Sequence, residues 1–131
     1  MSQENIDYYS VAKDLAAKGE IELAIAPLIV AIQDEPRNPK LHSLLGVLYN
    51  KMRDFDNGFK HLRLGTVYGE QLPPAEQANA WSQLGLAYYS IGKIAEATLA
   101  FEKAIQKDPL NHLSLNQLGV MYFNMKNFNA G

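Results

Sequence analysis

The chain has 131 residues, of which 47% are hydrophobic and 20% are charged, and its formal net charge is -2. This balance predicts one soluble domain with a core, and it gives no basic excess that would attract nucleic acid or an anionic membrane. Cysteine is absent, which excludes disulfides, thiol catalysis and thiolate metal sites.

The N-terminal sequence, MSQENIDYYS, has neither the basic nor the apolar segment of a secretory signal. No apolar run approaches the roughly 18 residues that indicate a membrane-spanning helix. We therefore expect a cytoplasmic protein that does not insert into a membrane.

Residues 5–38 show the pattern of two short helices joined by a turn. Gly19 is placed to form that turn, because glycine readily breaks a helix. Pro36 ends the second helix, since the residue before a proline is pushed out of the helical conformation. Residues at helical spacing mark the two helices; they are Tyr8, Val11, Ala12, Leu15, Ala24, Leu28 and Ala31.

Residues 39–77 form a second unit of the same kind, with a five-residue insertion at its end. Leu45, Gly46 and Tyr49 mark its first helix. Its second helix is less regular, with small residues at Gly58 and Gly65 and Leu62 in a place that the next unit fills with an aromatic residue. Pro73 and Pro74 lie in the insertion. Proline is favoured in the first helical turn, so we expect the next helix to begin near Pro74.

Residues 78–111 show the pattern most clearly. Gly92 provides the turn and Pro109 the end of the second helix. The residues at helical spacing on the two helices are Trp81, Leu84, Gly85, Tyr88, Ala97, Phe101 and Ala104.

Residues 112–131 match only the first helix of a unit, with Leu115, Leu118 and Tyr122 at helical spacing. The sequence NMKNFNAG that follows is interpreted as a turn and the start of a second helix. The three apolar side chains would then face a helix that is absent, at a loss of roughly 1.5–3 kcal/mol each. We interpret the chain as part of a longer array, with self-association through this open unit as the alternative.

The spacing from Trp81 to Pro109 resembles the signature of the tetratricopeptide repeat (TPR), a helix–turn–helix unit of about 34 residues. The resemblance implies an all-α fold, a right-handed superhelical α-solenoid of antiparallel helix pairs. Residues 1–131 would then form a single TPR array of three full repeats and the first helix of a fourth. Gly46, Gly85 and Gly119 take equivalent places, where a missing side chain lets the paired helix approach closely.

No residue pattern indicates catalysis, and we expect neither an enzyme nor a cofactor. His42, His61 and His112 lie on three different expected helices without the spacing of metal ligands. No nucleophile elbow or glycine-rich phosphate loop is present. We expect His42 to be packed, because it takes the place of a large residue in its unit, and His61 and His112 to lie at the surface.

The resemblance implies a role in protein–protein interaction, because the first helices of TPR arrays line a concave groove that binds partners. We expect a non-catalytic scaffold whose groove binds a peptide or helix of a partner protein. The groove residues, carried over by spacing, are Tyr9, Lys13, Ser43, Val47, Asn50, Lys51, Asn79, Ser82, Leu86, Tyr89, Asn116, Val120, Phe123 and Asn124.

Val47, Leu86 and Val120 occupy equivalent places and are expected to form an apolar strip, which is typical of an interaction surface. Amides such as Asn79 and Asn116 can both donate to and accept from a peptide backbone. The alternative is that some of these residues contact the adjacent repeat instead.

One TPR subtype clamps the carboxylate tail of chaperones with lysine, asparagine and arginine side chains. The matching positions here hold Tyr9, Lys13, Leu44, Asn79 and Gln83. One cation remains, so this ligand is disfavoured. Two other functions stay open. The chain could be the N-terminal TPR segment of a larger bacterial enzyme of transferase type, or a self-assembling structural scaffold.

Overall fold

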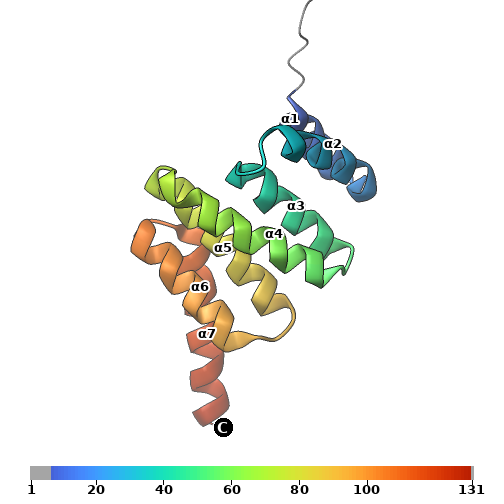
Figure 1. Ribbon diagram of the computed structural model, residues 1–131. Coiled ribbons are helices and arrows are strands. Elements are labelled where there is room, and N and C mark those ends of the chain that lie inside the picture. The colour runs from blue at the N-terminus through green and yellow to red at the C-terminus, as the bar shows by residue number, and fades with distance from the viewer. Residues whose placement is uncertain (1–6, 131) are drawn as a thin grey trace, which may run out of the picture. The chain divides into compact units, whose positions relative to one another are not determined.

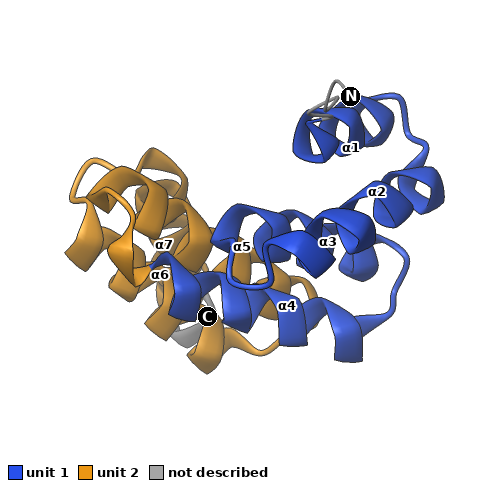
Figure 2. Ribbon diagram, turned by 45° about the horizontal axis from the view of Figure 1, so that its top comes forward, with its two compact units in different colours: residues 1–69 blue, residues 70–131 orange. Residues whose placement is uncertain are grey.

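The computed structural model describes the backbone of residues 7–130 and the side chains of residues 7–126 (Figure 1). Over this part of the chain it contains seven α-helices, a short 3-10 helix and no strand. The expected all-α class is therefore confirmed. The chain divides into two compact units, residues 1–69 and residues 70–131 (Figure 2).

The first unit contains two helix pairs. Helix α1 packs on α2, α3 packs on α4, and α2 also packs on α3. The helices are α1 (Tyr8–Ala17), α2 (Ile21–Asp34), α3 (Pro39–Lys51) and α4 (Phe55–Tyr68).

Side-chain caps fix where three of these helices begin. Asp7 accepts a hydrogen bond from the backbone N–H of Ser10 at 3.1 Å, at the start of α1. Asn38 and Asp54 cap α3 and α4 in the same way. Each cap satisfies a backbone donor that the first turn of a helix leaves without a partner.

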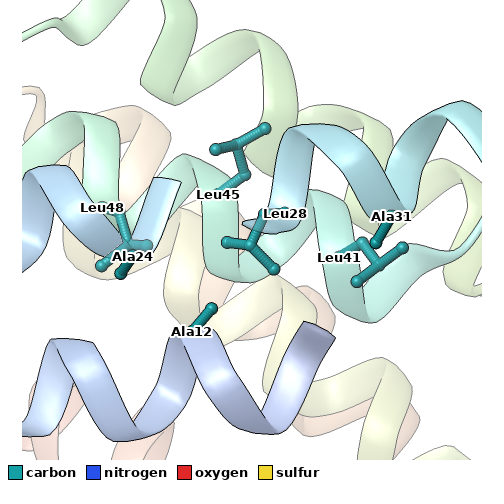
Figure 3. Close-up of a cluster of buried hydrophobic side chains, with 7 residues drawn as sticks. All are labelled: Ala12, Ala24, Leu28, Ala31, Leu41, Leu45 and Leu48. Atoms are coloured by element: carbon teal, nitrogen blue, oxygen red, sulfur yellow. The ribbon is translucent and has the colours of Figure 1, made fainter. Parts of the chain in front are cut away.

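The core of the first unit lies between α1, α2 and α3 (Figure 3). Small residues let the helices approach, and leucines fill the space between them. The buried residues are Ala12 from α1, Ala24, Leu28 and Ala31 from α2, and Leu41, Leu45 and Leu48 from α3.

The second unit contains one helix pair and a third long helix. Its first helix begins at Pro74, as expected from the preference of proline for the first turn. Helix α5 packs on α6, and α6 packs on α7. The 3-10 helix Gly69–Gln71 precedes α5 (Pro74–Ser90), α6 (Ile94–Lys107) and α7 (His112–Ala130).

Two turns use glycine as expected. Gly19 between α1 and α2 and Gly92 between α5 and α6 both have φ of +82°, a left-handed conformation that glycine adopts without steric cost. The turn between α3 and α4 places Arg53 in the same region, with φ of +67°. No glycine marks this turn, so the sequence does not predict it.

The interpretation of the C-terminal residues as a turn is wrong, because α7 continues to Ala130. No proline or internal glycine interrupts residues 120–130, so the helix has no local signal to end. Leu118 does not face an absent helix either. It is 6% exposed and packs with Met121, Ala97 and Phe101 in the core of the second unit.

Candidate functional site

The expected binding residues of the first unit lie on α1 and α3. Tyr9 is half-buried against the core, and the ammonium group of Lys13 lies 5.4 Å from the centre of its ring. Val47 is half-buried and Lys51 is exposed. These four side chains keep surface that a ligand could contact.

Two other expected groove residues, Ser43 and Asn50, point at α4 instead. The hydroxyl of Ser43 lies against Gly65, and the amide oxygen of Asn50 lies against Gly58, where it is buried with no hydrogen-bond partner. The two glycines leave space on α4, and these side chains fill it. Their expected place in an open groove is therefore corrected.

Ser82 is also wrong as an open groove residue, because it is only 1% exposed. Its hydroxyl donates to the carbonyl oxygen of Ala78 at 2.6 Å and lies 3.3 Å from Oδ1 of Asn111. Asn111 Oδ1 accepts from the N–H of Ser114 at 2.9 Å, near the start of α7. Ser82 thus belongs to the junction between α5 and α7.

Asn79 lies at the edge of this junction. It is exposed, and its Oδ1 accepts from Nδ2 of Asn111 at 3.5 Å. Leu86 and Tyr89 are half-buried against the core residues Ala97, Phe101, Leu118 and Met121. Part of the Leu86 and Tyr89 side chains therefore contacts neighbouring helices, and the rest is open to a ligand.

The open part of the expected surface in the second unit comes from α7. Val120 is 48% exposed and Phe123 is 62% exposed. Asn116 and Asn124 on the same helix are also exposed. This helix therefore offers two large apolar side chains and two amides to solvent.

A histidine pair that the sequence does not mark joins α3 to α4. Nδ1 of His42 lies 3.0 Å from Nδ1 of His61, and Nε2 of His42 lies 2.7 Å from the carbonyl oxygen of Pro36. Because a carbonyl only accepts, His42 carries its proton on Nε2. Its Nδ1 then accepts the hydrogen bond that His61 donates.

The expected surface position of His61 is corrected by this pairing, whereas His42 is buried as expected. The ring of His61 stacks on those of His42 and Tyr49, with centroids 5.2 Å and 5.7 Å away. Burial lowers the pKa of His61 to about 4, and the electrostatic effects of the neighbouring His42 ring and of Lys60 lower it further. His61 is thus neutral at pH 7 and holds α4 against α3.

Within residues 7–126, no group of three or more histidine, aspartate or glutamate side chains could hold a metal ion. None of the described helices combines the length and apolar character needed to cross a membrane.

Comparison with known proteins identifies the third helix pair, α5 and α6. The model of the tetratricopeptide repeat family matches residues 78–111, which are the limits expected for the third unit. The TPR domain of Sgt2 from Aspergillus fumigatus superimposes with a TM-score of 0.79 at 24% identity, over 95% of this chain and 80% of that one. Residues 78–111 therefore belong to the tetratricopeptide repeat family, and the described helices share the fold of TPR domains. 

A second TPR structure, the first TPR of Spaghetti (RPAP3) bound to the HSP90 peptide SRMEEVD, gives a TM-score of 0.77 at 18% identity. It covers 91% of this chain and 90% of that chain. A curated relative, Protein CTR9 homolog of Arabidopsis thaliana, is 31% identical over 108 residues. Those residues are 82% of this TPR chain but 9% of the length of the relative.

Proposed function

We propose that this TPR chain is a non-catalytic scaffold, acting in the cytoplasm, that binds a peptide or helix of a partner protein on the surface of its first helices. The exposure of Val120 and Phe123 on α7 carries the proposal, since exposed apolar side chains of this size mark interaction surfaces. The similar TPR of Spaghetti supports it, because that domain is bound to a peptide.

The surface favours a peptide with apolar anchors. Val120 and Phe123 offer apolar contact, and Leu86 and Tyr89 on α5 keep part of their surface open. Asn116 supplies an amide that pairs with a peptide backbone. The first unit, taken by itself, also keeps partly exposed apolar surface at Tyr9 and Val47.

An acidic chaperone tail fits this surface poorly. Of the clamp positions, Lys13 alone carries a positive charge, and its ammonium group already lies over the ring of Tyr9. A peptide such as SRMEEVD presents two glutamates, an aspartate and a terminal carboxylate, which need several cations. We therefore expect this peptide to bind more weakly than one with apolar anchors.

The proposal is tested by selecting, from a random library, peptides that bind the chain. The affinity of a selected peptide is then measured for the intact chain and for variants. Val120→Ser combined with Phe123→Ser is expected to weaken the selected peptide at least tenfold. Leu99→Ser is the matched control, because Leu99 is 64% exposed on α6, outside this surface. Equal affinity for the double variant and the control would overturn the proposal.

A further inference from the structure

The outer face of α2 is apolar and exposed. Leu23, Ile29 and Val30 lie on it with 61%, 42% and 44% of their surface open to solvent. The opposite face carries Ala24 and Leu28, which point into the core of the first unit (Figure 3). Helix α2 is therefore apolar on both sides, a pattern that is typical of helices covered on both sides.

The second helices of the other two pairs do not share this face. Helices α2, α4 and α6 each have 14 residues, so their positions compare directly. The third, ninth and tenth residues are Leu23, Ile29 and Val30 in α2, Asn57, Arg63 and Leu64 in α4, and Glu96, Glu102 and Lys103 in α6. Five of the six counterparts are polar. The helix-pair fold does not require an apolar face here, so the face of α2 needs another explanation.

Acidic residues stand at both ends of this face. Glu22 lies beside Leu23 at the start of α2, and Asp34 and Glu35 follow at its end; all three are exposed. Helix α2 contains no lysine or arginine. A partner that covers the apolar side chains would therefore be favoured by basic residues that reach the two ends.

We propose that the outer face of α2, formed by Leu23, Ile29 and Val30 between Glu22 and Asp34, docks an amphipathic helix of a partner protein whose apolar stripe is flanked by lysine or arginine. Leu23 and Val30 lie two turns apart on one side of α2, which is the spacing of the apolar anchors that such a helix presents. Glu22 and Asp34 are roughly 18 Å apart along the helix axis. This surface is separate from the first helices and does not depend on the proposed function.

The test measures binding of a labelled helical peptide by fluorescence anisotropy. The peptide carries a leucine stripe with a lysine pair at each end, and a second peptide replaces the lysines with glutamates. We expect the lysine-flanked peptide to bind the intact chain at least tenfold more tightly than the glutamate-flanked one. Raising the salt from about 50 to 500 mM should weaken it, because exposed charges are screened.

Substitutions locate the site. Leu23→Gln combined with Val30→Gln is expected to lower the affinity for the lysine-flanked peptide at least tenfold. Leu99→Gln, on the outer face of α6, is the matched control and should leave that affinity unchanged. Glu22→Gln combined with Asp34→Asn leaves the apolar side chains in place. This charge-neutralised variant should show a smaller preference for the lysine-flanked peptide over the glutamate-flanked one.

Three results would overturn the proposal. Equal affinity of the lysine-flanked peptide for the intact chain and for the Leu23 and Val30 double variant would exclude docking on this face. Equal affinity for both peptides would exclude a basic partner. A dimer of the intact chain in light scattering that the same double variant abolishes would make a second copy the occupant.

Discussion

Gly85 on α5 lies directly against the ring of Phe101 on α6, so that a methyl group at Gly85 would stand 2.7 Å from Cε1 of that ring. Gly46 meets Leu62 at the same distance in the first unit. Gly119 takes the equivalent place on α7, yet nothing lies within 4 Å of a methyl group there. Glycines that look alike in the sequence thus differ in what surrounds them.

Gly85→Ala and Gly119→Ala are therefore expected to have opposite effects. The first should lower the free energy of unfolding by about 1–3 kcal/mol, because the buried ring of Phe101 has no room to move. The second should raise it by about 0.5–1 kcal/mol, since alanine is the better helix former. Urea unfolding followed by the fluorescence of Trp81, in the same unit, measures both. Equal effects would contradict the close approach of α5 and α6.

Leu118→Ala and Leu115→Ala test which side of α7 packs against α6. Leu118 is buried against α6, so its loss should cost about 2–5 kcal/mol of unfolding free energy. Leu115 is 42% exposed and should cost less than about 1 kcal/mol. If the two variants melted at the same temperature, the orientation given to α7 would be wrong.

The histidine pair predicts that stability falls in mild acid. The pKa of His61 is about 4 in the folded chain, against 6.5 for an ordinary histidine, so the unfolded state binds more protons between these values. The stabilisation that comes from keeping His61 neutral is complete above pH 6.5 and is lost as the pH falls to about 4. We expect a loss of about 1–2 kcal/mol, below the full linkage value because His61 is partly exposed.

Urea unfolding at pH 7 and pH 5, followed by circular dichroism, checks this dependence. His61→Gln keeps a donor toward His42 but does not titrate, so its stability should change less between the two pH values. His112→Gln is the control, because His112 is exposed. A change in the intact chain no larger than that of His61→Gln would refute the assignment.

The left-handed backbone of Arg53 predicts that glycine at this position stabilises the chain. Its φ of +67° costs an L-residue roughly 1–2 kcal/mol, whereas glycine adopts it freely. Arg53→Gly should raise the free energy of unfolding by about 0.5 kcal/mol, because the greater freedom of glycine in the unfolded chain offsets part of the gain. A thermal melt of both proteins measures the difference, and a lower melting temperature for the variant would count against the left-handed turn.

Local signals were sufficient to predict most of the helix pairs. Gly19 and Gly92 mark turns because their backbone conformation favours glycine, and Pro74 marks a helix start because proline fits the first turn. The turn at Arg53 cannot be predicted from the sequence, because no glycine or proline marks it. The polar residues near the end of α7 suggest a turn, but without a proline or an internal glycine they allow the helix to continue.

The candidate site was harder to predict, because register along a helix does not say what stands opposite. Ser43 and Asn50 share the register of groove residues, but Gly58 and Gly65 on α4 leave space that these side chains fill. Ser82 is buried by the junction with Asn111, which lies 29 residues away in sequence. The pairing of His42 with His61 also joins two helices, so no spacing along the chain marks it.

The central claim, that partners bind on the first helices, is tested most directly by mapping where a peptide binds. The chain is labelled with ¹⁵N, a library-selected peptide is titrated in, and the amide chemical shifts are followed by NMR. We expect the largest changes in chemical shift on α5 and α7, around Leu86, Tyr89, Val120 and Phe123. Changes confined to the outer face of α6 around Leu99, with those four residues unaffected, would contradict it.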